Sequence, residues 1–226
     1  MNLIVFDIDD TLTKSEKQHQ MAFVNAMKDF SILSIDKNWK SYAHHTDSHI
    51  LKVNYENNLP QKFDFSFIES FEARMMEYLK TYEEVNEITG AKEMLKDLID
   101  KSKYAIAFAT GSLLKPALLK LEQAGLDIDA NLVTASNAIY EREGIVKQAI
   151  ERAQELNRVD SFENIISVGD GIWDLKTAEN LGLHFIGIGK KNFEDFKKEN
   201  IKVHIDNWLG FDLHLAERQL GIEVPI

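Results

Sequence analysis

Five aspartates stand just after two short apolar runs of the chain: Asp7, Asp9, Asp10, Asp170 and Asp174. The first three follow Leu3–Phe6, and the other two follow Ile165–Val168. Carboxylates gathered at the end of a buried strand repel one another and lose their hydration, and a divalent cation would relieve both costs. Because oxygen ligands suit Mg²⁺, which usually binds beside phosphate, the pattern predicts a magnesium site for phosphate chemistry. The alternative for each group is a turn or loop that caps the next helix.

A hydroxyl-bearing segment follows a third apolar run. Thr110, Gly111 and Ser112 come directly after Tyr104–Ala109. A hydroxyl there, together with the backbone N–H groups at the start of the next helix, can bind a phosphate oxygen. The segment is therefore a candidate phosphate-binding loop, and capping of the next helix by Thr110 or Ser112 is the alternative.

Arg142 and Lys147 are the candidates for a cation beside this site. Arg142 stands just before a helix predicted for Ile145–Leu156, and Lys147 lies within that helix. A basic side chain near the aspartates would offset their charge and the charge of a phosphoryl group. The alternative for each residue is a solvated place at the surface, where most lysines and arginines lie.

Strands alternate with helices along most of the chain, and these elements must position the candidate residues. Short apolar segments predict strands at Leu3–Ile8, Tyr104–Thr110, Leu132–Ala135 (the weakest), Asn164–Gly169 and His184–Gly189. Apolar residues three and four apart predict helices at Ala91–Lys101, Leu113–Gln123, Ile145–Leu156 and Leu175–Leu181. This alternation is typical of an α/β fold, with a parallel sheet covered by helices on both faces. Because ligands bind beyond the carboxyl ends of parallel strands, we expect the candidate residues to lie together there.

Residues 14–86 contain no convincing strand and break this alternation. Three helices are expected in this stretch, on the Phe23–Phe30 face, the Ser41–Tyr55 segment and the apolar stripe Phe67–Tyr82. We therefore expect two domains. A core domain would comprise residues 1–13 and 87–226, and a helical cap domain, residues 14–86, would be inserted after the first strand.

The composition excludes several functional classes. The chain has 226 residues and no cysteine, so it forms no disulfide and binds no metal through thiolates. Its formal net charge of −11 argues against general nucleic-acid binding, which needs a basic face. No apolar run has the length of a membrane span, and a charged residue comes too early for a signal peptide. We expect a cytoplasmic protein that binds neither nucleic acid nor a membrane.

Four segments of the chain carry a family resemblance when they are taken together. They are FDIDDTL at residues 6–12, ATGS at 109–112, the basic residue at the start of a helix, and GDGIWD at 169–174. In order and spacing they resemble the motifs of the haloacid dehalogenase-like (HAD) hydrolase superfamily. The resemblance covers most of residues 1–13 and 87–205. It implies a Rossmann-like core with a helical cap, Mg²⁺ as cofactor, and an aspartyl-phosphate intermediate.

The resemblance also implies catalytic roles for three residues. Asp7 would be the nucleophile that attacks phosphorus, and Thr110 would bind the phosphoryl group. Asp9 would protonate the leaving oxygen and later activate water. Members of the superfamily that cleave carbon–halogen bonds or phosphonates lack an aspartate two residues after the nucleophile. The presence of Asp9 therefore favours phosphate esters as substrates.

The metal site and the basic residue follow from the same resemblance. Asp170 would bind Mg²⁺ together with Asp7 and the backbone carbonyl of Asp9, and Asp174 would support these ligands. The run from Arg142 to Val146 is similar to the Lys-x-x-Ile-Leu run of the family, which gives the basic role to Arg142. Lys147 is the competing candidate.

One segment of the expected cap also resembles the family. Residues His45–Leu51 are similar to a Thr-Asp-x-x-Ile-Leu segment of some capped relatives. This likeness makes Thr46 a candidate substrate contact. Capping of a helix by Thr46 or Asp47 is the alternative.

The expected function is magnesium-dependent hydrolysis of small phosphomonoesters, so that the partner is a small phosphorylated metabolite. Two alternatives stay open at this point. A phosphomutase or phosphotransferase would use the same motifs and differ only in what accepts the phosphoryl group from Asp7. A ligand-binding protein could keep the fold without catalysis. The oligomeric state is not readable from these motifs.

Overall fold

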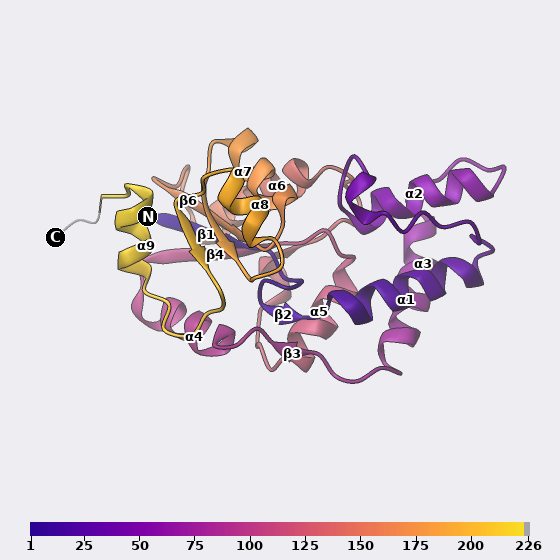
Figure 1. Cartoon of the computed structure of the whole chain (residues 1–226), viewed down its shortest axis with the longest axis horizontal. Coiled ribbons are helices and arrows are strands. Elements are labelled where there is room, and N and C mark those ends of the chain that lie inside the picture. Colours follow the sequence, from indigo (N-terminus) through magenta and orange to yellow (C-terminus); the bar gives the residue numbers. More distant parts are fainter. Residues whose placement is uncertain (224–226) are drawn as a thin grey trace.

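A six-stranded parallel sheet lies at the centre of the computed structural model, which describes residues 1–223 (Figure 1). In spatial order its strands are β5 (Val133–Thr134), β4 (Tyr104–Ala109), β1 (Asn2–Phe6), β6 (Ile165–Gly169), β7 (His184–Ile188) and β8 (Val203–Ile205). The structure confirms the predicted α/β fold, and one strand overlaps each of the five predicted segments. The short strand β8 at the edge was not predicted.

Helices cover both faces of this sheet. One face packs against α4 (Ala91–Lys101), α5 (Leu114–Gln123) and α9 (Leu213–Leu220). The other face packs against α6 (Arg142–Asn157), α7 (Ile172–Leu181) and α8 (Phe193–Lys198). Among residues 1–223, no helix is both long enough and apolar enough to cross a bilayer.

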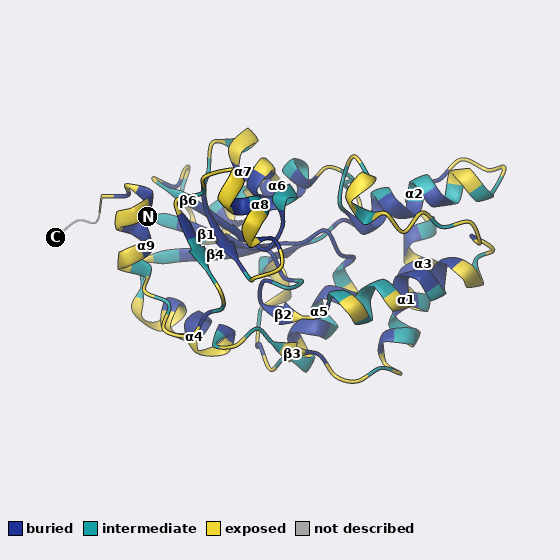
Figure 2. Ribbon diagram, in the orientation of Figure 1, coloured by how far each residue is buried: buried dark blue, intermediate teal, exposed yellow. Residues whose placement is uncertain are grey.

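The central strand β1 is buried on both faces, as Figure 2 shows. Ile4 and Phe6 point into the hydrophobic cluster under α4 and α5, while Leu3 and Val5 point into the cluster under α6. A strand buried in this way needs apolar side chains at every position, which explains the continuous apolar run in the sequence.

The segment between β1 and α4 forms a helical insertion that extends from one end of the sheet (Figure 1). Its three helices are α1 (Glu16–Asp29), α2 (Asp47–Asn58) and α3 (Phe67–Leu79), and they share a separate hydrophobic cluster. The chain enters and leaves the insertion through two short strands, β2 (Thr13–Lys14) and β3 (Asn86–Glu87), which pair antiparallel. This pair was not predicted, and it ties the two ends of the insertion together.

The middle helix of the insertion begins later than predicted. Helix α2 starts at Asp47, whereas the prediction began at Ser41, which lies in a short 3₁₀ turn, Trp39–Ser41. Thr46 is the reason, because its extended backbone makes it the N-cap, and its Oγ1 accepts a hydrogen bond from the His49 N–H at 3.4 Å.

Replacement of Phe71 tests how much the hydrophobic cluster of the insertion contributes to the stability of the fold. Its side chain is fully buried, and its ring lies 5.2 Å from the ring of Phe23. We expect Phe71→Ala to lower the free energy of unfolding by about 3–5 kcal/mol, because a large cavity forms. Urea denaturation measures the change. The matched control is Phe193→Ala, at a position 41% exposed. Equal losses in the two variants would contradict this account of the packing.

Candidate active site

The carboxyl ends of three adjacent strands place the main candidate residues side by side. Strand β1 lies between β4 and β6, with Phe6 opposite Phe108 on one side and Val168 on the other. The residues that follow these strand ends therefore meet at the middle of the sheet. They are Asp7, Thr110 and Asp170, and all three are buried.

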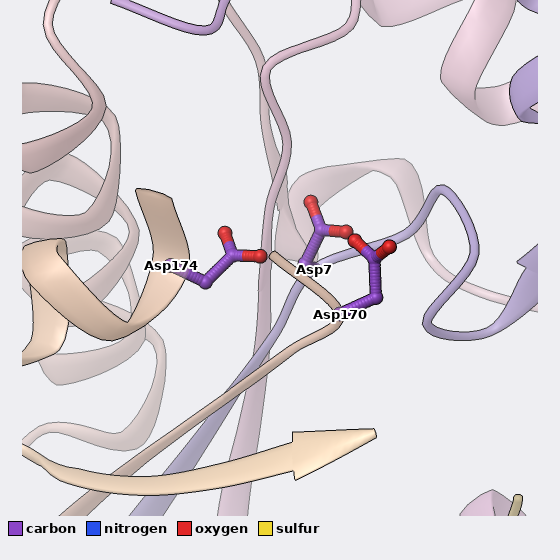
Figure 3. A group of neighbouring side chains, drawn as sticks. All are labelled: Asp7, Asp170 and Asp174. Atoms are coloured by element: carbon purple, nitrogen blue, oxygen red, sulfur yellow. The ribbon is translucent and has the colours of Figure 1, made fainter. Parts of the chain in front are cut away.

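Asp7, Asp170 and Asp174 form a buried acidic cluster (Figure 3). Each offers a carboxylate oxygen, and these oxygens lie within 4.8 Å of one another. Burial raises the pKa of Asp7 to about 7, although Arg142 opposes the shift. Burial also raises the pKa of Asp170 well above its usual value, and the negative charges of Asp174 and Asp7 add to this effect. Mg²⁺ prefers oxygen ligands. A bound cation would also favour the ionised form of these buried carboxylates.

The three carboxylates differ in the partners that they already have. Both oxygens of Asp174 accept hydrogen bonds, one from Arg142 at 2.5 Å and one from the Gly171 N–H at 3.1 Å. Asp7 accepts from Arg142 and from Thr11 Oγ1. In the described part of the chain, no donor reaches the carboxylate of Asp170. Asp170 is thus the carboxylate most in need of a cation, while Asp174 orients Arg142 and the loop.

Arg142 is the basic residue that the structure brings to the aspartates. It begins helix α6, is buried, and its Nη2 lies 2.6 Å from Asp7 Oδ1 and 2.5 Å from Asp174 Oδ1. Lys147 lies further along the same helix, on its exposed side, and does not line the pocket. The guanidinium can reach two carboxylates at once because it carries several donors in a fixed plane.

Gly111 makes room for this arrangement. A Cβ atom added there would lie 2.6 Å from Arg142 Nη1 and 2.6 Å from the backbone oxygen of His45. Any side chain at this position would push the Thr110–Ser112 segment away from Arg142 and from the backbone of the insertion at His45. The requirement for glycine is therefore one of space.

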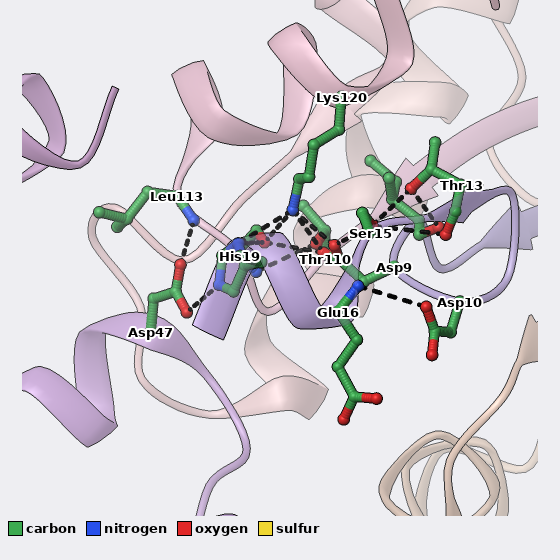
Figure 4. Close-up of polar contacts among 12 residues, drawn as sticks. Asp9, Asp10, Thr13, Ser15, Glu16, His19, Asp47, Thr110, Leu113 and Lys120 are labelled. Atoms are coloured by element: carbon green, nitrogen blue, oxygen red, sulfur yellow. Dashed lines mark hydrogen bonds and ion pairs between the residues drawn. The ribbon is translucent and has the colours of Figure 1, made fainter. Parts of the chain in front are cut away.

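Asp9 has a different cationic partner, which sequence reasoning missed. Lys120 Nζ lies 2.6 Å from Asp9 Oδ1 and 2.7 Å from Oδ2, and Ser15 Oγ also donates to this carboxylate at 2.5 Å (Figure 4). Burial alone would raise the pKa of Asp9, but Lys120 holds it well below its usual value. The signal in the sequence was a lysine within the apolar stripe of α5, where Ala117 and Leu121 are buried beside it.

The hydroxyl candidates have several partners within the protein. Ser112 Oγ donates to Asp9 Oδ2 at 2.8 Å, so it supports the acid/base candidate. Thr110 Oγ1 accepts from the Ser112 N–H at 3.0 Å. Thr46 lines the pocket, yet its hydroxyl caps α2 and donates to the backbone oxygen of Tyr140 at 2.8 Å.

A pocket of about 80 Å³ connects these groups with the helical insertion. The insertion contributes Phe23, Trp39 and His45 to its walls. The His45 ring stacks on Trp173 of the core, with ring centroids 3.9 Å apart and an angle of 7° between the planes. The insertion thus covers the acidic cluster and leaves a small, partly aromatic space beside it.

Comparison with known proteins gives the chain a family and structural relatives. A family model described as haloacid dehalogenase-like hydrolase matches residues 4–188. No curated protein matches the sequence.

Many solved structures match the chain, and three of them illustrate the likeness at low sequence identity. A family IA hydrolase from Entamoeba histolytica has a TM-score of 0.71 at 14% identity, over 98% of this chain and 100% of its own. A β-phosphoglucomutase from Clostridium difficile has a TM-score of 0.70 at 16% identity, over 97% of this chain and 96% of its own. The CbbY protein of Rhodobacter sphaeroides, in complex with xylulose 1,5-bisphosphate, has a TM-score of 0.69 at 14% identity, over 92% of this chain and 95% of its own. At these identities the likeness shows the fold alone.

Gly111→Ala tests the close packing around Arg142. We expect it to lower the free energy of unfolding by about 1–3 kcal/mol, because the new methyl group meets a guanidinium and a backbone oxygen. The control is Gly144→Ala in helix α6, where the added Cβ would lie 2.8 Å from Ile139 Cγ2 and 4.0 Å from Glu141 Cβ, both side-chain atoms. There the gain in helix propensity, about 1 kcal/mol, opposes the cost of shifting one methyl group, so the loss should be smaller than at Gly111. Urea denaturation measures the free energy of unfolding of both variants. A Gly111→Ala protein as stable as wild type would contradict the requirement for glycine at this position.

Proposed function

The chain belongs to the haloacid dehalogenase-like hydrolase family, and we propose that it is a magnesium-dependent hydrolase of small phosphomonoesters. The reaction would pass through a phosphoryl group bound covalently to Asp7. The observation that carries this proposal is the buried cluster of Asp7, Asp170 and Asp174. Asp9, a fourth carboxylate with its own partners, stands beside that cluster.

The residues at the carboxyl ends of β1 and β6 would hold the metal. Asp7 and Asp170 would supply carboxylate oxygens, the backbone carbonyl of Asp9 would be the third protein ligand, and Asp174 would support them. The charge of bound Mg²⁺ would neutralise phosphoryl oxygens and keep Asp7 ionised. Burial raises the pKa of Asp7 despite Arg142, and burial together with the negative charges of Asp174 and Asp7 raises the pKa of Asp170. A cation beside both carboxylates would favour their ionised forms, which supports this assignment.

Two aspartates have different roles in the two displacement steps. In the first step the carboxylate of Asp7 attacks phosphorus, the bond to the ester oxygen breaks, and the alcohol leaves with a proton from Asp9. In the second step Asp9 takes a proton from water, whose oxygen attacks the phosphorus. Inorganic phosphate leaves and Asp7 is regenerated. Arg142 and Thr110 would stabilise charge on the phosphoryl oxygens.

The charges in the pocket favour water over a second substrate as the phosphoryl acceptor. A mutase using Asp7 would form a bisphosphate and would need a free cation for the second phosphate. Arg142 is the single lysine or arginine among the described residues that line the pocket, and Asp7 and Asp174 occupy its Nη2. Lys191 does not line the pocket. Its charge lowers the pKa of Asp170, and its ammonium group forms an ion pair with Glu16.

The helical insertion, residues 14–86, would act as a cap domain that selects the substrate. Its side chains Phe23, Trp39 and His45 form walls of the pocket, opposite the reacting aspartates. A small enclosed pocket admits a metabolite more readily than a folded protein. It would also exclude bulk water during the first step.

Phosphate release is the direct test. We expect release from some of a panel of phosphomonoesters in the presence of Mg²⁺, and loss of release with a chelator. Asp7→Asn should lower kcat by at least about a thousandfold, because no nucleophile remains. The panel contains p-nitrophenyl phosphate, neutral sugar phosphates and a bisphosphate, with product analysis by mass balance. An isomeric phosphate as product would mean a mutase, and no turnover of any compound would mean a non-catalytic protein.

A pair of variants tests which basic residue serves the reaction. We expect Arg142→Met to lower kcat about 100- to 1000-fold, as the loss of one charge-stabilising donor does in other enzymes. Lys147→Met, on the exposed side of the same helix, should leave kcat and KM unchanged. Thermal unfolding of both variants controls for loss of structure. The opposite result would assign the basic role to Lys147.

A further inference from the structure

The described insertion residues that line the pocket include carboxylates and aromatic rings but neither lysine nor arginine. The phosphoryl group of a substrate would lie at the acidic cluster of the core, so the leaving alcohol must extend toward the insertion. There the pocket meets Glu16 and Asp47, the first residues of α1 and α2 (Figure 4), and the rings of Phe23 and Trp39. The charge on this side of the pocket therefore selects the leaving alcohol.

Asp47 keeps its negative charge although a histidine contacts it. His19 Nε2 lies 2.8 Å from Asp47 Oδ1. The other nitrogen of that ring, Nδ1, lies 3.1 Å from Lys120 Nζ, and an ammonium group has only donors. Nδ1 must therefore accept, which leaves the ring neutral with its proton on Nε2. A neutral donor orients the Asp47 carboxylate without cancelling its charge.

Glu16 adds a second negative charge, which a lysine outside the pocket compensates only in part. Its Oε2 pairs with Lys191, a half-exposed side chain, and its Oε1 accepts from Gln20 Nε2 at 3.0 Å. Solvent weakens such an exposed ion pair. Asp10 also lines the pocket, where it accepts from the Glu16 N–H at 3.3 Å. The partial positive charge at each helix start, about half an elementary charge, does not cancel three carboxylates.

His45 of the same wall supplies no positive charge at neutral pH. Its ring stacks on Trp173 and is largely removed from water. Burial and the charge of Arg142 lower the pKa of this ring to about 4, although Asp47 and Glu16 oppose the shift. The negative charges of both carboxylates thus act on the same part of the pocket.

The aromatic rings and the size of the pocket restrict the leaving alcohol further. Phe23, Trp39 and Trp173 line the pocket, and the face of an aromatic ring attracts an ammonium group within about 6 Å. The pocket volume of about 80 Å³ is far below the roughly 300–1,000 Å³ of sites for drug-sized ligands. A short alcohol fits this space, whereas a nucleoside does not.

We propose that the substrates are phosphomonoesters of short amino alcohols, whose ammonium group would lie between Glu16, Asp47 and the aromatic rings of the pocket. This inference rests on the proposed function, in which the alcohol leaves from the phosphorus attacked by Asp7. The carboxylates and the ring faces both attract an ammonium group. A leaving alcohol that carries a carboxylate or a second phosphate is repelled by the same carboxylates.

Three esters of nearly equal size separate charge from shape. They are 2-aminoethyl phosphate, 2-hydroxyethyl phosphate and carboxymethyl phosphate, whose alcohols are cationic, neutral and anionic at pH 7. We expect kcat/KM in the presence of Mg²⁺ to be at least about tenfold higher for the aminoethyl ester than for the hydroxyethyl ester, and lowest for the carboxymethyl ester. Equal values, or a preference for the carboxymethyl ester, would contradict the proposal.

Glu16→Gln tests whether the charge of the pocket wall sets this preference. The readout is the ratio of kcat/KM for the aminoethyl ester to that for the hydroxyethyl ester, in which a change in basal rate or in folded fraction cancels. We expect the ratio to fall at least about threefold, because one carboxylate is lost. The matched control is Glu69→Gln, in the first turn of α3, exposed and outside the pocket, where the ratio should equal that of wild type. An unchanged ratio in Glu16→Gln overturns the assignment.

Binding measured without turnover separates this inference from the proposed function. Calorimetry of the Asp7→Asn protein with Mg²⁺ gives the Kd of each ester, and we expect the tightest binding for the aminoethyl ester and the weakest for the carboxymethyl ester. This order of binding, with no phosphate release from any ester by wild type, would overturn only the proposed function. Phosphate release from all three esters at similar kcat/KM would overturn only the preference for a cation. Neither binding nor release would overturn both.

Discussion

Asp7 and Asp9 stand two residues apart at the end of one strand, yet two different buried cations compensate them. Arg142 reaches Asp7 from the start of α6, and Lys120 reaches Asp9 from α5 on the opposite face of the sheet. Strand β1 ends at Phe6, and the chain beyond it turns, so that Asp7 meets a cation from α6 while Asp9 meets one from α5. Much of the surrounding structure follows from the need for these two cations, including the glycine at position 111 that gives Arg142 room.

The two aspartates consequently have different chemical properties. Burial dominates at Asp7, whose pKa rises to about 7 despite Arg142. The charge of Lys120 dominates at Asp9, whose pKa lies well below its usual value despite burial. The lowered pKa favours the ionised form of Asp9, which suits the base that takes a proton from water in the second step. As the proton donor of the first step, Asp9 needs this pKa to rise when the substrate binds. A bound cation at Asp7 and Asp170 would restore the charged form that a nucleophile needs.

The helical insertion is more than a cover over this site. It supplies His19 and Asp47 to the contacts around Lys120, and its helix α2 begins on the core loops, where Thr46 donates to the backbone of Tyr140. The fold itself is shared with hydrolases and with a phosphoglucomutase. Because one fold supports several reactions, the pocket walls and their charges decide the function.

The sequence by itself determined the sheet, its helices and the acidic positions. Apolar runs that end in Asp7, Thr110 and Asp170 identify buried parallel strands, and parallel strands place their carboxyl ends together. These inferences succeed because they depend on local patterns and on a topology with few alternatives. The sequence left Arg142 and Lys147 as competitors and gave no weight to Lys120.

Only the tertiary structure decided which cation meets which carboxylate. A rotation of 100° per residue along a helix separates a side chain that enters the site from one that faces solvent, and motif spacing does not determine that rotation. The partners of Lys120 are Asp9, His19 and Ser112, which are distant from it in the sequence, and Asp47 contacts His19 in turn. The cost of burying the Lys120 charge is offset by groups from both parts, Asp9 and Ser112 of the core and His19 of the insertion.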